Sequence, residues 1–210
     1  GHPGTLPTIN KEAVRQVLRV GVAVGGTLAD ETEFSRKNYF YPDLPKGYQI
    51  SQYAQPLVSA GTLHGVALTR IHLEEDTGIS MHDQGDYSLL DFNRAGVPLL
   101  ELVTEPVIHS GRDASLFARE LQLLLRALGA SDANMEKGEM RIEANISVGI
   151  GEKLGTKVEV KNLNSFKAVE RAIEYETKRQ STLLERGGRV AQETRGWNEQ
   201  KQETFSQRAK

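Results

Sequence analysis

Two glutamates that interrupt apolar runs are the first candidates for chemistry. Glu101 lies within the run VPLLELV, where strand alternation places it on one face with Leu99 and Val103. Glu75 ends the run GVALTRIHLEE, on the face that also carries Ile71. An ionised carboxylate among apolar neighbours costs free energy unless a cation or hydrogen-bond donors compensate it. We therefore expect Glu75 and Glu101 to come from two neighbouring strands and to share a hard cation.

The other face of the first of these strands carries Arg70, His72 and Glu74, because side chains alternate across a strand with a period of two. A histidine in this position is either a hydrogen-bonded strand residue or a metal ligand. The sequence leaves both interpretations of His72 open.

A third acidic candidate lies in the most regular alternating segment, residues 140–148. Ile142 and Ala144 belong to its apolar face, and Glu143 and Asn145 to its polar face. The polar face is either solvated or the floor of a polar cleft, and in the second case Glu143 is a third ligand. Three glutamates suit Mg²⁺ or Mn²⁺. Together with cations and no protein nucleophile, they favour phosphoryl transfer or metal-assisted hydrolysis.

Residues 33–53 combine cations with six of the 13 aromatic residues of the chain. Arg36, Lys37 and Lys46 alternate with aromatic side chains such as Tyr41, and Pro and Gly interrupt any long helix or central strand. Such a segment suits contact with phosphate or a nucleotide. The alternative is a loop held by its aromatic residues that covers the core.

The motif DFNRAG places an acceptor, an amide and a fork-shaped cation within four residues, as Asp91, Asn93 and Arg94. This set could hold a nucleotide phosphate or a substrate carboxylate. It is equally typical of an Asx turn.

The elements that must position these residues predict an α+β fold with an antiparallel sheet flanked by helices. Helices are expected after the caps Asn10, Ser110 and Asn164 or Ser165. Hairpins are expected over residues 61–74 and 140–162, and the tail is expected to form a peripheral hairpin whose partner is missing. The glycines at 21, 25 and 26 predict a helix that packs closely and then stops; the alternative is a phosphate loop, although no Lys-Ser/Thr pair follows.

Composition narrows the class of protein. The 210 residues carry a net charge of −2, so any polyanion site must be a local patch. The absence of cysteine excludes a disulfide framework and thiol chemistry. No apolar run approaches the roughly 20 residues of a membrane span, so we expect no membrane partner. The chain opens with GHPG rather than Met, which predicts a cloning scar or an internal piece of a longer protein.

Four long motifs carry a resemblance that extends over essentially all 210 residues. They are RKNYFYPDLPKGYQISQ, HLEEDTG, DFNRAGVPLLELVTEP and the segment from MEKGEMRIEANIS to GTKVEVKNLNSF. In these motifs the chain resembles the B subunits of the tRNA-dependent aspartyl/glutamyl amidotransferases, a family that includes the archaeal E subunit.

The resemblance implies an ATP- and Mg²⁺-dependent enzyme subunit of the cytoplasm of bacteria, or of an organelle. Such a subunit phosphorylates the side-chain carboxylate of Glu-tRNA(Gln), and often of Asp-tRNA(Asn). Ammonia from a partner glutamine amidase subunit then displaces the phosphate, and a small C subunit completes the complex. The implied fold is a single catalytic cradle domain over residues 1–210. The family's N-terminal GLEVH strand, with its Glu and His ligands, and its C-terminal helical and tail domains are expected to be missing from this chain.

The resemblance also implies roles for individual residues. Glu75 and Glu101 match metal ligands of the family, and Glu143 stands where the family has the Asp of a D-A-N motif, one methylene shorter. Lys37, with Arg36, matches a loop expected to contact the phosphates. The expected catalytic residues are thus Glu75, Glu101 and Lys37; the expected ATP- and substrate-binding residues also include Tyr41, Asp91, Asn93 and Arg94.

Two other functions are compatible with the residues. One is a catalytically inactive fragment that serves as a docking scaffold for tRNA and the amidase, since the ligand-bearing first strand is not in the chain. The other is a stand-alone Mg²⁺-dependent hydrolase of phosphoesters.

Overall fold

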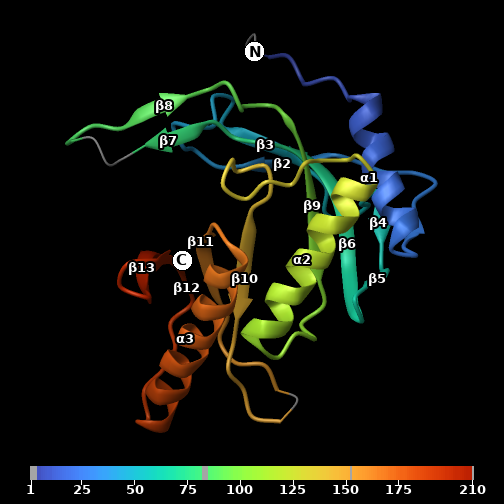
Figure 1. Ribbon diagram of the computed structural model, residues 1–210. Helices are drawn as coiled ribbons and strands as arrows, with labels where there is room; N and C mark the ends of the chain where they lie inside the picture. The colour runs from blue at the N-terminus through green and yellow to red at the C-terminus, as the bar shows by residue number, and fades with distance from the viewer. Residues whose placement is uncertain (1–3, 82–84, 152, 210) are drawn as a thin grey trace. The chain divides into compact units, whose positions relative to one another are not determined.

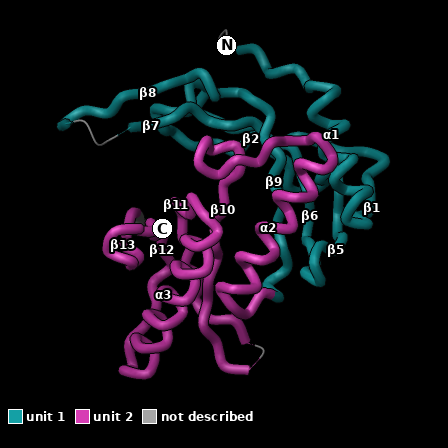
Figure 2. The backbone as a smooth tube through the Cα atoms, viewed as in Figure 1, with its two compact units in different colours: residues 1–107 teal, residues 108–210 magenta. Residues whose placement is uncertain are grey.

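The computed structural model describes residues 4–81, 85–151 and 153–209, and contacts divide the chain into two compact units (Figures 1 and 2). Unit 1 spans residues 1–107 and unit 2 residues 108–210. Both combine helices with mostly antiparallel strand pairs, so the predicted α+β class is confirmed. The single catalytic domain expected over residues 1–210 stays a prediction.

Within its described residues, unit 1 contains one helix and nine strands. Its main sheet has the order β1-β4-β6-β5, and β9 pairs with β6 beside it. The elements are α1 (Lys11–Ala23), β1 (Thr27–Leu28), β2 (Ser35–Asn38), β3 (Tyr48–Ser51), β4 (Val58–Ser59), β5 (Thr62–Leu63), β6 (Val66–Glu75), β7 (Ile79–Met81), β8 (Leu89–Asp91) and β9 (Pro98–Thr104).

Helix α1 covers one face of this sheet. Asn10 caps it as predicted, with its side-chain oxygen accepting from the backbone N–H groups of residues 12 and 13. A Cβ built on Gly21 would lie only 2.5 Å from a methyl carbon of Val58 in β4, so the helix approaches the strand more closely than any side chain would allow. The glycine run therefore serves close helix–sheet packing, as the sequence predicted.

The long strand β6 and its antiparallel neighbour β9 position the predicted acids. Their register pairs Arg70 with Val103, His72 with Glu101, and Glu75 with Pro98. A bulge between Leu68 and Arg70 precedes this stretch, and the pairing beyond it is regular. Residues directly opposite each other in an antiparallel pair share a face, so the register assigns every side chain here to one of two faces.

Two small hairpins complete unit 1. Strands β2 and β3 pair antiparallel within the aromatic and cationic segment, and β7 pairs with β8. The expected hairpin over residues 61–74 is also present, as β5 and β6.

Unit 2 packs two helices with a four-stranded sheet of order β10-β11-β12-β13. Ser110 and Ser165 cap its helices as predicted. Trp197, Val158 and Val160 from the sheet and Ala172 from α3 lie in its core. The elements are α2 (Gly111–Ala127), β10 (Ile142–Ile146), β11 (Val158–Leu163), α3 (Phe166–Glu185), β12 (Glu193–Asn198) and β13 (Glu203–Ala209).

The tail hairpin corrects one prediction. Strands β12 and β13 pair antiparallel as expected, but their partner is not missing, because β12 pairs parallel with β11. The 20-residue helix α3 is the crossover that a parallel connection requires. Within the described residues, neither α3 nor any other helix is long and apolar enough to span a membrane.

Candidate active site

Three side chains from β6 and β9 form the main cluster of possible ligands. His72 and Glu101 are directly paired across the two strands, and Glu74 lies two residues further along β6 on the same face. One ligand atom from each of the three residues lies within 4.8 Å of the other two. His72 and Glu74 are buried, whereas Glu101 is partly exposed. Two carboxylates and an imidazole thus converge on one face of the sheet.

The two carboxylates perturb each other electrostatically. Burial raises the pKa of Glu101, and the neighbouring charge of Glu74 raises it further, while His72 and Lys37 act in the opposite direction. Burial would also raise the pKa of Glu74, but hydrogen bonds from His72 and Ser51 hold it below its ordinary value. Glu74 is therefore the preferred anion of the pair, and Glu101 is the acid that retains a proton more readily.

The cluster has the properties of a cation site. His72 is 2% exposed, and its Nδ1 atom has no hydrogen-bond partner among the residues that the structure describes, although buried polar atoms are normally satisfied. A cation between the carboxylates would also relieve the repulsion that raises the pKa of Glu101. Carboxylate oxygens suit Mg²⁺ or Mn²⁺, and imidazole widens the choice among transition metals. The residues present therefore fit a divalent cation.

Glu75 does not join this cluster, which corrects the expectation that it shares a cation with Glu101. The register separates Glu75 from His72 by three residues along β6, an odd number, so Glu75 faces the opposite side of the sheet. Its carboxylate accepts hydrogen bonds from Lys46 Nζ at 2.7 Å and from the backbone N–H of Ile50 at 2.9 Å. The charge of Glu75 is thus compensated by two donors of the β2–β3 hairpin: the ammonium group of Lys46, between the two strands, and the backbone N–H of Ile50 in β3.

The sequence contained a signal for the residues of β6 that join Glu101 in the cluster. Alternation grouped His72 with Glu74, and the expectation failed because it assumed that the apolar faces of the two strands coincide. In the structure Leu99, Glu101 and Val103 share the face of Arg70, His72 and Glu74. Strand β9 is apolar on both faces, since Leu100 and Leu102 occupy the other, so its pattern could not select one.

The predicted phosphate-binding cations lie on the β2–β3 hairpin. Lys37 is exposed and close enough to the cluster for its charge to favour the ionised forms of Glu74 and Glu101. Its ammonium group lies 5.9 Å from the centre of the Tyr39 ring. The guanidinium of Arg36 lies 5.9 Å from the Tyr48 ring, and Tyr41 packs against Tyr39 with ring centres 5.7 Å apart. The hairpin therefore presents cations that are held by aromatic rings.

The DFNRAG motif forms a structured turn. Asp91 accepts hydrogen bonds from the backbone N–H of Asn93 at 2.8 Å and from its side-chain amide at 2.7 Å, which is the Asx-type alternative. Arg94 donates to the carbonyl oxygens of Thr77 and Gly78, both at 3.0 Å. Arg94 thus joins the DFNRAG turn to residues 77–78. Ligand binding by Asp91, Asn93 and Arg94 stays a prediction.

Glu143 belongs to unit 2, on β10. Its carboxylate pairs with Lys161 Nζ at 2.9 Å, and its side chain is 48% exposed. These contacts are those expected if the polar face of residues 140–148 is solvated. Metal binding by Glu143 stays a prediction.

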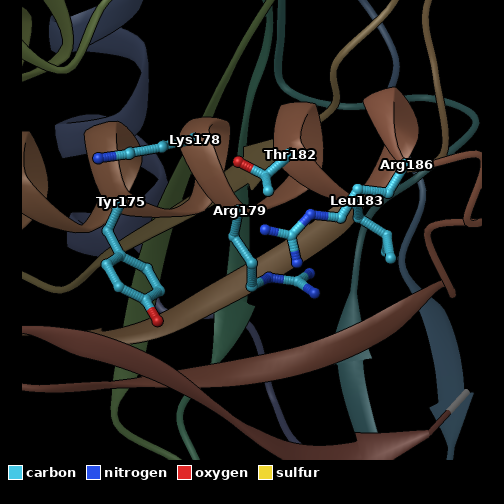
Figure 3. Close-up of a pocket in the computed structure, with 6 residues that line it drawn as sticks. All are labelled: Tyr175, Lys178, Arg179, Thr182, Leu183 and Arg186. Atoms are coloured by element: carbon cyan, nitrogen blue, oxygen red, sulfur yellow. The ribbon is translucent and has the colours of Figure 1, made fainter.

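A hollow of about 460 Å³ lies along α3 in unit 2 (Figure 3). None of the predicted site residues lines it. Its lining residues lie on one face of the helix: Tyr175, Lys178, Arg179, Thr182, Leu183 and Arg186.

Comparison with known families explains the four sequence motifs. Residues 1–210 match the family described as GatB/GatE catalytic domain. The chain belongs to this family. The resemblance seen in the motifs is therefore confirmed, and it extends through both units of this GatB/GatE chain.

Similar curated GatB/GatE proteins are named as B subunits of aspartyl/glutamyl-tRNA(Asn/Gln) amidotransferases. The protein of Thermodesulfovibrio yellowstonii is 49% identical over 100% of this chain and 46% of its own length. That of Thermus thermophilus is 51% identical over 100% of this chain and 46% of its own length. That of Chlorobaculum tepidum is 49% identical over 99% of this chain and 46% of its own length. The chain thus spans about half the length of the curated relatives it matches.

Proposed function

We propose that this chain is the part of an amidotransferase subunit that activates the side-chain carboxylate of a misacylated tRNA. The substrates are ATP and Glu-tRNA(Gln), with Asp-tRNA(Asn) as a second substrate. The observation that carries the proposal is the cluster of His72, Glu74 and Glu101 beside Lys37, in a chain of the GatB/GatE family. The reaction takes place in the cytoplasm, where aminoacyl-tRNAs are made and used.

The chemistry explains why acids and cations are needed together. A carboxylate is a poor acyl donor, and transfer of the γ-phosphoryl group of ATP to one of its oxygens turns that oxygen into a leaving group. Ammonia then attacks the carbonyl carbon, forms the amide and releases phosphate. Positioning and charge stabilisation account for most of the catalysis of such phosphoryl transfers.

Each residue of the cluster has a task in this proposal. Glu74 and Glu101, with His72, would hold Mg²⁺ or Mn²⁺. When bound, the ion neutralises negative charge on the triphosphate and on the carboxylate. Lys37 attracts the phosphates of ATP, and Arg36 adds a second cation on the same hairpin. Glu75 holds Lys46 and Ile50, which keeps the hairpin in place.

The partners follow from the same chemistry. Free ammonia is scarce as the uncharged nucleophile at neutral pH, so a glutamine amidase subunit would supply it, and a small C subunit would join the two. The relatives are named as one lettered subunit of an amidotransferase, which supports an assembly of several subunits.

Substitutions of the two neighbouring glutamates test the ligand set. In the complete amidotransferase, Glu74→Gln should weaken Mn²⁺ binding and ATP-dependent amidation of Glu-tRNA(Gln) by about 100-fold or more, because it removes a ligand charge. Glu75→Gln is the matched control and should leave Mn²⁺ affinity within about threefold, because its carboxylate faces the other side of the sheet. Electron paramagnetic resonance titration of free Mn²⁺ measures the affinity. Equal Mn²⁺ affinity in Glu74→Gln and the unaltered protein would contradict the proposed ligand set.

A further inference from the structure

Arg70 lies on the face of β6 that also carries His72 and Glu74, and it takes no part in the chemistry proposed above. It precedes His72 by two residues on β6, so its side chain leaves the sheet on the face of the acid cluster. Its direct partner on β9 is Val103, which places Glu101 diagonally across from it. Diagonal pairs in an antiparallel sheet have Cα atoms about 7–8 Å apart, within the reach of a long side chain.

The guanidinium of Arg70 nevertheless has no acidic partner in the part of the chain that the structure describes. Within the described residues, no carboxylate lies within ion-pairing distance of it, and its buried Nε atom has no hydrogen-bond partner. Two other cations near the end of β6 do have acidic partners: Lys46 pairs with Glu75, and Arg94 with Asp76. Because buried donors are normally satisfied, Arg70 points to an acceptor that the described residues do not supply.

The guanidinium of Arg70 packs against an aromatic ring. It lies 5.4 Å from the centre of the Tyr53 ring, just beyond β3, and Tyr53 itself is 77% exposed. A guanidinium packed on an aromatic ring keeps its donors in the plane available, and that planar fork matches the two oxygens of a carboxylate or phosphate group. The planar fork of Arg70 thus lies on the same face of the sheet as the His72–Glu101 pair, with donors available to an oxyanion.

We propose that Arg70 binds an oxyanion of the substrates, a phosphate group of ATP or the side-chain carboxylate of the aminoacyl-tRNA, next to the acid cluster. This inference rests on the proposed function, because that reaction brings both oxyanions to the cluster. Arg70 complements Lys37: the lysine provides a point charge, and the arginine provides two donors in fixed geometry.

The test uses the complete amidotransferase, in which the full-length subunit carries Arg70→Gln. If the oxyanion belongs to the nucleotide, the affinity for the magnesium complex of AMP-PNP falls about tenfold or more, as measured by calorimetry. If it belongs to the aminoacyl group, the KM for Glu-tRNA(Gln) rises by about the same factor while nucleotide affinity is unchanged. Arg15→Gln is the matched control, since Arg15 is an exposed arginine of unit 1 that pairs with Glu12, and it should change neither quantity.

Unchanged nucleotide affinity and unchanged KM in a folded Arg70→Gln protein would overturn the inference. If that variant does not fold, Arg70→Lys carries the test. Lysine keeps the positive charge but lacks the planar pair of donors, so Arg70→Lys should also lower the nucleotide affinity or raise the KM for Glu-tRNA(Gln). Values equal to those of the unaltered protein would count against oxyanion binding by Arg70. The unaltered complex separates the two proposals. If it neither binds the nucleotide nor amidates Glu-tRNA(Gln), the proposed function fails; if it does both and the variants match it, only the role of Arg70 fails.

Discussion

Glu101 shows how one residue connects burial to chemistry. Its carboxyl is partly buried beside Glu74, and both effects raise its pKa. A raised pKa in the folded state means that the folded protein binds the proton more tightly than the unfolded chain does. The stability that this proton contributes is present at low pH and is lost as the pH rises through the raised pKa. A divalent cation would replace the proton in this role at neutral pH.

The pH dependence of stability therefore tests Glu101. In a chelating buffer, Glu101→Gln should unfold at a higher temperature than the unaltered protein at about pH 8 and at a similar temperature at about pH 4, because only the unaltered protein must ionise this group. Thermal unfolding followed by circular dichroism at several pH values measures the difference. In a buffer without chelator, added Mn²⁺ should stabilise the unaltered protein and not the variant. A constant difference across the pH range would show that Glu101 does not titrate as inferred.

At the scale of elements, the β2–β3 hairpin depends on β6 for its position. Glu75 accepts from Lys46 and from the Ile50 backbone, and the side-chain amide of Gln49 donates to the Glu75 carbonyl oxygen at 2.8 Å. Ser51 contacts Glu74 at 2.8 Å. The end of β6 thus holds the element that carries Arg36 and Lys37.

Loss of the Lys46–Glu75 pair should loosen this hairpin. Lys46→Met leaves the buried Glu75 charge with fewer donors, so the backbone amides of β2 and β3 should exchange with deuterium about ten times faster. Hydrogen exchange followed by mass spectrometry measures this for residues 35–51. Lys137→Met, at an exposed position outside the hairpin, is the control and should leave exchange in this segment unchanged. Unchanged exchange in Lys46→Met would mean that other contacts hold the hairpin.

At the scale of a whole unit, a buried polar network joins helix α3 of unit 2 to the tail hairpin. Glu176 on α3 is 0% exposed and accepts from Arg179 at 2.6 and 2.9 Å, from Gln180 at 2.9 Å and from Thr204 of β13 at 2.8 Å. Arg195 of β12 approaches the same carboxylate at 3.5 Å. One side chain thus connects the helix to the two strands of the tail hairpin.

Removal of this charge should destabilise the chain. Glu176→Gln leaves the arginines around it without their buried counter-ion, so the free energy of unfolding should fall by about 2–4 kcal/mol. Urea denaturation measures the change, and hydrogen exchange should show it chiefly in residues 166–207. Glu174→Gln, an exposed glutamate of the same helix, is the matched control and should change stability by less than about 0.5 kcal/mol. Equal stability of the two variants would remove Glu176 from this role.

Much of the fold followed from local rules that act within a few residues. The caps Asn10, Ser110 and Ser165, the close-packing Gly21 and the alternation of β10 were all readable, because helix capping and strand alternation depend on neighbouring residues. The long motifs also identified the family, because ungapped agreement over whole segments rarely arises by accident. For the candidate site, the sequence identified Glu101 and Lys37 as candidate functional residues, and it placed His72 and Glu74 on the same face of one strand.

Only the tertiary structure decided which acids meet. The register of β6 and β9 moved the partner of Glu101 from Glu75 to Glu74 and His72, and a shift of one residue would have reversed that choice. The same kind of long-range pairing brought β12 beside β11. Strand pairing joins residues that are distant in the chain, and no local pattern determines it when a strand such as β9 is apolar on both faces.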